Sequence, residues 1–156
     1  MYQWLRKVET FWRLPIKRKF FFLLNYMLCG VAKTLIILLP YRVLSRYFGY
    51  SHRMTVASTL PTMKQRQRAY ALGRAVRLAA RHTPWDSSCL TQALVAKFWC
   101  DRWGIPYFLF IGLQKNSAKP LGKEAHAWLT TGPVAVTGGY CFESHHVISS
   151  FSSIKA

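Results

Sequence analysis

Residues 85–100 read WDSSCLTQALVAKFWC, a stretch in which a polar loop turns into an apolar helix. The small polar residues at positions 86–88 favour a helix N-terminus, and Gly104 favours its end. Between Cys89 and Trp103 the residues are apolar nearly all round, which is typical of a helix buried in a core. The stretch therefore predicts a central buried helix that begins with a cysteine.

The hydrophobic period changes from helical to strand-like after this helix. Short aromatic and β-branched runs predict buried strands, and Gly132-Pro133 predicts a hairpin turn. The strands are expected at residues 107–113, 125–131, 134–138 and 146–151, with a loop at 114–123. The C-terminal half should thus be a buried helix followed by an antiparallel meander, within an α+β fold.

A further helix is predicted upstream, at residues 62–81. Its apolar stripe consists of Leu72, Val76 and Ala79. Basic residues line another side at helical spacing: Arg74, Arg77 and Arg81. These cations form either the solvated face of a core helix or a docking face for an acidic peptide, and the pattern leaves both interpretations open.

The segment 20–39 is apolar and close to a membrane span in length. Asn25 and Lys33 interrupt it, and a central Lys is costly in hydrocarbon. We therefore expect one or two hydrophobic helices, docked on the domain or on a membrane surface, rather than a span. Residues 47–61 show no clear period and are predicted to be a linker. This divides the chain into a basic, hydrophobic helical region at 1–60 and a second domain at 61–156.

The formal charge of the 156-residue chain, +17, is unevenly distributed. Residues 1–85 hold 16 of the 22 Lys and Arg residues against a single acidic residue, Glu9, a net charge of +15. Such a field favours anionic lipid, polyanions or an acidic peptide. No nucleic-acid-binding motif accompanies the charge, so nucleic acid is not an expected partner.

The cysteines are widely spaced, and neither a C-x-x-C motif nor a zinc-ligand spacing is present. No metal or other cofactor is therefore expected. No signal peptide with a cleavage site is evident, which predicts free thiols in the reducing cytoplasm. The adjacent His145 and His146 should point to opposite faces of a strand and so not share a metal. Cys100, far along the apolar helix, and Cys141 are predicted not to be catalytic.

Cys89 and His126 are the candidate catalytic pair. A helix start stabilises thiolate over thiol through its unpaired N–H groups and its dipole. The backbone N–H of Cys89 is also a natural donor to an oxyanion. His126 opens a predicted strand, and an imidazole facing the thiol would act as base and then as acid. Taken alone, the two residues fit structural roles as well.

The order of several motifs extends this hypothesis beyond the pair. Trp85, Cys89-Leu90, Gly104-Ile105-Pro106, Gly112, His126-Ala127-Trp128 and Gly138-Gly139 follow one another in the chain. In this order the chain resembles the stand-alone leader peptidases of lasso-peptide biosynthesis, which are transglutaminase-like, papain-like cysteine proteases. The N-terminal part ending in Leu39-Pro40-Tyr41-Arg42 is similar to the front of that form.

The resemblance implies a cysteine-type endopeptidase that removes the leader of a ribosomally made precursor peptide through an acyl-enzyme. Cys89 matches the nucleophile and His126 the base. The partners implied are the precursor, a separate leader-binding protein and an ATP-dependent macrolactam cyclase. The fold implied is a nucleophile helix packed on an antiparallel sheet.

The sequence does not identify the group that orients His126. The residues opposite His126 across the predicted hairpin are about Gly138 and Gly139, and neither has a side chain. Glu143 is a candidate third member, and a backbone carbonyl or water would serve equally well. Trp85 and Trp128 either wall the cleft or pack in the core. Two other functions remain: an acyl transferase on the same fold, or a basic adaptor at a membrane surface without catalysis.

Overall fold

The computed structural model describes residues 15–52, 60–114, 125–139, 141 and 143–153. The helices are α2 (Ile16–Leu38), α3 (Tyr41–Leu44), the 3-10 helix η1 (Ser45–Tyr47), α4 (Met63–Ala80) and α5 (Cys89–Arg102). The strands are β1 (Tyr50–His52), β2 (Phe108–Gln114), β3 (Ala125–Thr131), β4 (Val134–Thr137) and β5 (His145–Ser152). Apart from Gln114, which ends β2, the loop predicted at 114–123 lies outside the described residues.

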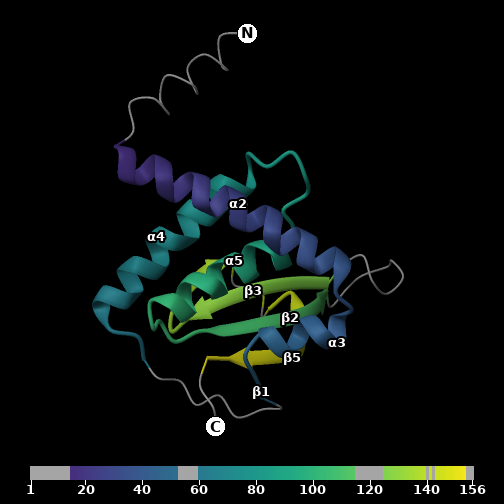
Figure 1. The fold of residues 1–156 in the computed structure, drawn as a ribbon. Helices are drawn as coiled ribbons and strands as arrows, with labels where there is room; N and C mark the ends of the chain where they lie inside the picture. The colour runs from purple at the N-terminus through teal and green to yellow at the C-terminus, as the bar shows by residue number, and fades with distance from the viewer. Residues whose placement is uncertain (1–14, 53–59, 115–124, 140, 142, 154–156) are drawn as a thin grey trace.

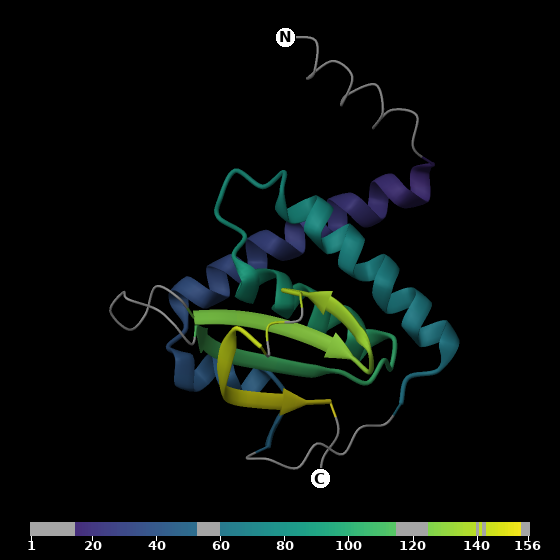
Figure 2. The same cartoon turned by 180° about the vertical axis from the view of Figure 1, so that it is seen from behind.

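The strands form one five-stranded antiparallel sheet in the order β1-β5-β2-β3-β4. Helix α5 packs on β3 and β4, α4 packs on β4, and α2 lies over both helices. Opposite views show the same arrangement, with the sheet on one side and α2 outermost on the other (Figures 1 and 2). The α+β fold with a buried helix on an antiparallel sheet is confirmed.

Helix α5 is the centre of the core, as its sequence predicts. Its small residues Ala93 and Ala96 are fully buried, which lets the helix approach the sheet closely. Leu109 of β2 and Leu129 of β3 fill the opposite side of the same core. The helix starts after Ser88 and ends at Arg102, so the predicted bounds of 89–103 are correct to one residue.

Helix α4 begins at the predicted position. The Thr62 hydroxyl accepts a hydrogen bond from the Gln65 backbone N–H, and the Gln65 side chain accepts one from the Thr62 N–H. This reciprocal pair satisfies two donors at the helix start and fixes where the helix begins. The predicted apolar stripe is buried, at Leu72, Val76 and Ala79.

Helix α2 is docked on the domain along one face only. Asn25, Cys29 and Ala32 are buried there, and the Asn25 Oδ1 accepts a hydrogen bond from Trp99 Nε1 at 3.1 Å. Docking on the domain is thus confirmed. By length and composition α2 could also cross a membrane, although buried core helices of other proteins meet the same criteria.

Two predictions about the sheet were wrong. Residues 47–61 were expected to be a linker, but Tyr50–His52 form β1, which pairs with Ser150–Ser152 of β5. The last strand was expected to follow β4 in a meander, but β5 pairs with β2 instead. One cause lies at β4, where the Val136 carbonyl accepts a hydrogen bond from Arg77 Nη1 of α4 at 3.0 Å. The Arg77 side chain therefore occupies a carbonyl at the β4 edge, whereas the edge of β2 away from β3 accepts β5.

Candidate active site

Cys89 is the first residue of α5, and its sulfur reaches the start of β3. The Sγ atom accepts a hydrogen bond from the backbone N–H of Ala127 at 3.4 Å. The side chain of Ser88, the N-cap, makes no capping hydrogen bond, so the N–H groups of the first turn keep no acceptor within the helix. Negative charge on this sulfur, or on an oxygen bound beside it, would therefore face backbone donors.

His126 is the residue before Ala127, so the thiol and the imidazole lie at the same end of β3. His126 Nε2 is 2.9 Å from the carbonyl oxygen of Gly138. A carbonyl can only accept, so Nε2 carries the proton in this contact. In a neutral imidazole the lone pair is then on Nδ1, which makes Nδ1 the basic atom.

Gly138 provides the carbonyl that fixes this tautomer because its backbone comes very close to β3. Its φ is +75°, and a Cβ there would lie 2.6 Å from the Ala127 carbonyl oxygen and 2.6 Å from Trp128 Cβ. The predicted hairpin register put Gly138 opposite His126, and a glycine has no side chain that could orient the imidazole. The backbone carbonyl makes the contact instead.

Two aromatic rings lie next to the His126 imidazole, Trp128 stacked on it and His145 tilted. Trp128 is fully buried and lies 6.0 Å from it, at 20° between the planes. His145, at the start of β5, lies 5.3 Å from His126 and 6.0 Å from Trp128. Of the two interpretations, Trp128 fits core packing, and it supports His126 from that position. The sequence did not link His145 to the site, because only the β5–β2 pairing brings it there.

The other thiols differ in their surroundings. Burial, and then Asp101, raise the pKa of Cys100 to about 12. Burial also raises the pKa of Cys29. Burial, and then Cys89, raise the pKa of Cys141, whose Sγ donates to the Gly138 carbonyl at 3.2 Å. Cys141 thus shares its acceptor with His126.

The loop that leads into Cys89 is held from two sides. The Thr83 hydroxyl contacts Ser87 Oγ at 2.8 Å, and the Gln92 amide donates to the Ser87 carbonyl at 2.9 Å. From α2, Lys33 pairs with the exposed Asp86 at 3.5 Å. The Trp85 ring packs on Tyr26 of α2, with ring centroids 5.4 Å apart. These contacts fix the direction from which the chain enters α5.

A cavity of about 390 Å³ lies beside this loop. It is lined by Arg77, Ala80, Arg81, Trp85, Asp86, Ser87 and Gln92. Trp85 therefore lines a cavity beside the loop that precedes Cys89, and its part in a substrate cleft stays a prediction. Arg81 is exposed there, whereas Arg77 is half-buried and bonded to Val136, and Arg74 is exposed on α4 outside this lining.

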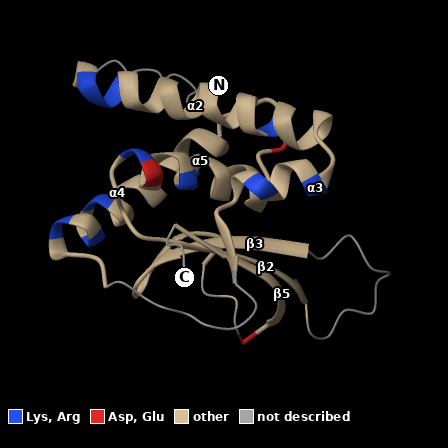
Figure 3. Ribbon diagram, turned by 60° about the horizontal axis from the view of Figure 1, so that its bottom comes forward, with Lys and Arg blue, Asp and Glu red and all other residues tan. Residues whose placement is uncertain are grey.

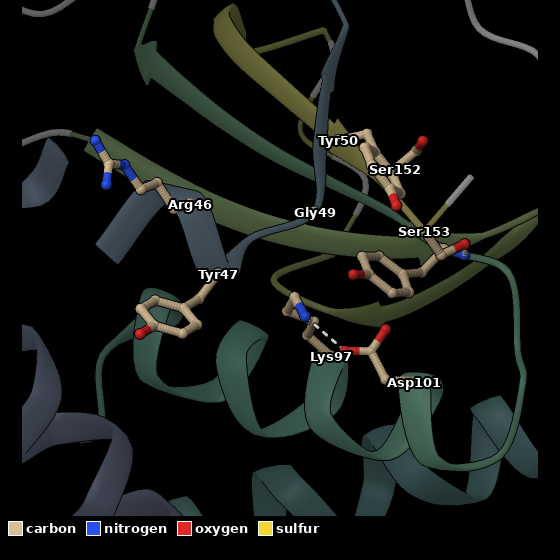
Figure 4. A pocket seen from close by; sticks show the side chains of 9 residues that line it. Arg46, Tyr47, Gly49, Tyr50, Lys97, Asp101, Ser152 and Ser153 are labelled. Atoms are coloured by element: carbon tan, nitrogen blue, oxygen red, sulfur yellow. Dashed lines mark hydrogen bonds and ion pairs between the residues drawn. The ribbon is translucent and has the colours of Figure 1, made fainter. Parts of the chain in front are cut away.

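A second cavity, of about 300 Å³, lies further along α5 from Cys89 (Figure 4). Lys97 and Asp101 form an ion pair at 2.5 Å on one wall, and Tyr47 and Tyr50 stand on another. Lys97 follows Cys89 by about two helical turns, or roughly 12 Å. This cavity is therefore separate from the Cys89–His126 pair.

The structure does not bring Glu143 to His126. Glu143 is exposed in the turn before β5, and no hydrogen bond joins it to His126 in the described part of the chain. The Gly138 carbonyl is the group at Nε2. Among the described residues no cluster of His, Cys, Asp or Glu could hold a metal ion.

The basic residues of the described chain lie on the helical side of the molecule, away from the strands. Within the described residues, strands β1–β5 contain no Lys, Arg, Asp or Glu. Lys and Arg gather on α2, α3 and α4, as Figure 3 shows. The basic region predicted from the sequence therefore covers the layers over the sheet.

The model of one protein family, described as the transglutaminase-like superfamily, matches residues 35–150. The comparisons with curated proteins and with solved structures gave no match. The matched range includes α3, η1 and β1, which the predicted division at residue 60 assigned to the N-terminal region; that division stays a prediction. Members of this superfamily are typically cysteine-type enzymes, proteases or acyltransferases. A helix that starts with a cysteine, packed on a strand that carries a histidine, agrees with the match, and the chain belongs to the transglutaminase-like superfamily.

Proposed function

We propose that this protein is a cysteine peptidase that removes the leader from a ribosomally synthesised lasso-peptide precursor. The observation that carries the chemistry is the contact of Cys89 Sγ with the residue after His126, whose imidazole is oriented by Gly138. The order of motifs from Trp85 to Gly139, which resembles the stand-alone leader peptidases, supports the choice of substrate.

Acylation begins when His126 Nδ1 takes the proton of the Cys89 thiol. The thiolate attacks the carbonyl carbon of the scissile peptide, and the oxyanion is stabilised by the backbone N–H of Cys89. The tetrahedral intermediate collapses, the C–N bond breaks, and the imidazolium gives its proton to the leaving amine. The freed amine is the new N-terminus of the core peptide, and the leader remains as a thioester on Cys89.

Deacylation requires a water molecule in the position that the leaving amine has vacated. His126 Nδ1 accepts a proton from that water while its oxygen attacks the thioester carbonyl. The C–S bond then breaks, the imidazolium returns its proton to the Cys89 thiolate, and the leader departs with a free carboxyl group. An amine in place of water would give an amide, which is the acyl-transfer alternative. The acceptor therefore distinguishes the two reactions.

The partners follow from the same proposal. A separate leader-binding protein holds the precursor, and an ATP-dependent cyclase closes the macrolactam on the freed N-terminus. The exposed Arg81, in the cavity beside the nucleophile loop, is placed to attract an acidic side chain near the junction. Arg74 extends the same positive charge along α4.

The test is a cleavage assay with a lasso-peptide precursor and its leader-binding protein, to be sought among the genes that neighbour this one, followed by mass spectrometry. Wild type should release leader and core peptide, each with the mass expected for hydrolysis. Cys89→Ala and His126→Ala should each lower kcat by roughly three orders of magnitude or more, because both act in one catalytic unit. Cys100→Ala, the same substitution on the same helix, should keep cleavage.

Three results would contradict the proposal. Cleavage by Cys89→Ala would exclude the nucleophile. A leader released only as an amide in the presence of a primary amine would favour the acyl transferase. A folded wild type that binds the precursor and never cuts it would favour the non-catalytic adaptor.

A further inference from the structure

Helix α2 carries a continuous apolar stripe that faces away from the domain. Along its length 42% to 82% of each side chain is exposed: Ile16, Phe20, Leu23, Met27, Val31, Leu35 and Leu38. Their spacing of three or four residues puts them on one face of the helix. A monomeric globular protein rarely leaves so long an apolar surface in water. The stripe therefore requires an occupant.

The opposite face of α2 rules out a bilayer on all sides of the helix. Asn25 and Cys29 are fully buried against the domain, and Asn25 accepts a hydrogen bond from Trp99 of α5. Lys33 pairs with Asp86 from the same side. A helix that spans a bilayer here would have to give up these contacts, whereas a helix in the plane of the interface keeps them.

The charges around α2 indicate which kind of surface covers the stripe. Lys17 is exposed and lies beside Ile16 and Phe20, since each residue advances the helix by about 100°. Arg42 follows the other end of the helix and is exposed. Long basic side chains that flank an apolar stripe extend to the phosphates of an anionic membrane.

We infer that α2 lies in the plane of an anionic phospholipid bilayer, with the stripe in the acyl region and the flanking cations at the headgroups. The helix is about 35 Å long at roughly 1.5 Å per residue, so it presents an extended contact. Trp85 packs on Tyr26 of α2, so the loop before Cys89 is fixed to the membrane-bound helix. Binding is independent of the reaction, and Cys89→Ala should bind lipid like wild type.

The test is flotation of the full-length chain with vesicles of phosphatidylglycerol and phosphatidylcholine in equal parts. Wild type should float with these vesicles, less with pure phosphatidylcholine, and less again as salt screens the cations. Met27→Glu should lower the partition coefficient about tenfold or more, because the apolar contact is lost where the stripe enters the lipid.

Ile148→Glu is the matched control, since Ile148 on β5 is 58% exposed and Met27 is 59% exposed. Both variants change charge equally, so only the position differs, and Ile148→Glu should float like wild type.

Equal flotation of the two variants overturns the inference, as does a wild type that does not bind anionic vesicles. A wild-type dimer that Met27→Glu converts to a monomer, without vesicle binding, would assign the stripe to a second copy. Resistance to extraction by alkaline carbonate would indicate a span instead.

Discussion

The carbonyl oxygen of Gly138 accepts hydrogen bonds from both His126 Nε2 and Cys141 Sγ. One backbone atom thus sets the tautomer of the His126 imidazole. Its position depends on a φ of +75° and on an approach to β3 that leaves no room for a Cβ. No carboxylate is needed at Nε2 for Nδ1 to be the basic atom.

Gly138→Ala should therefore impair both folding and catalysis. The added Cβ would clash with Ala127 and Trp128, in addition to a cost of about 1–2 kcal/mol for the left-handed conformation. Gly139→Ala is the control, because Gly139 has a φ of +74° but its Cβ would meet no described atom within 4 Å. Both variants carry the cost of the left-handed conformation, and only Gly138→Ala adds the clash. The difference between them in melting temperature and kcat therefore measures the effect of the clash. Equal losses in the two would contradict a special role for the Gly138 carbonyl.

Alkylation should distinguish the thiols by position and by pH. Iodoacetamide at limiting amount and neutral pH should label Cys89 first, where backbone donors face the sulfur. The raised pKa of Cys141 keeps it protonated, so its labelling should increase only as the pH rises toward that pKa. Cys100 is fully buried, with a pKa of about 12, and should stay unlabelled in the folded protein. Peptide mapping by mass spectrometry gives the order, and early labelling of Cys100 would contradict it.

At the scale of elements, α4 is attached to the edge of the sheet by Arg77. Its Nη1 donates to the Val136 carbonyl, and the neighbouring Gly73 lets the helix approach that same carbonyl. The sequence grouped Arg77 with Arg74 and Arg81 as one basic face. Helical spacing does not reveal that one of these side chains turns toward β4.

Arg77→Ala should lower the free energy of unfolding by about 1–3 kcal/mol, because the Val136 carbonyl loses a charged donor. Arg74→Ala, an exposed position on the same helix, should change it by less than about 0.5 kcal/mol. Urea denaturation of both variants measures the difference. A similar loss in both would mean that the general positive charge of α4, and not this hydrogen bond, stabilises the protein.

Local signals predicted the helices well and the sheet order poorly. Thr62 and Ser88 mark helix starts within the sequence itself, and the helices begin after them. The position of β5 depends on which strand edge is free, and β1 depends on a partner far along the chain. Neither is encoded in the period of the strand's own residues.

At the scale of the whole molecule, the charge lies over the helices and next to the loop that precedes Cys89. We expect cleavage to be slow without the leader-binding protein and faster with it, since binding raises the effective concentration of the junction. Arg81→Glu should weaken this acceleration several-fold, and the wild-type acceleration should fall as salt is raised. Arg66→Glu, the same charge change at an exposed site earlier in α4, is the control. Cleavage rates that do not change with the leader-binding protein, with salt or with Arg81→Glu would contradict recruitment by charge.

The sequence could predict side chains of the candidate site, but not its backbone groups or the contacts that depend on strand pairing. Cys89 and His126 were proposed as the catalytic pair from a helix start, a strand start and a family resemblance. Gly138 contributes a carbonyl, and His145 arrives through the β5–β2 pairing, so composition and spacing could not assign either role. Glu143 was named because it is a carboxylate downstream, yet it lies exposed in a turn.

Strand β5 is synthesised after the other described strands, yet it lies between β1 and β2 in the sheet. Tyr50 pairs with Ser152, so β1 waits for a partner about one hundred residues further along the nascent chain. Contacts of such long sequence separation slow folding, because a long loop must close before any interaction compensates for it. During translation α4, α5 and the β2–β3–β4 hairpins can assemble first, while β1 and the free edge of β2 stay unpaired. The ring of His145 reaches His126 only when β5 pairs with β2, so the surroundings of this imidazole depend on a strand that is made after β1–β4.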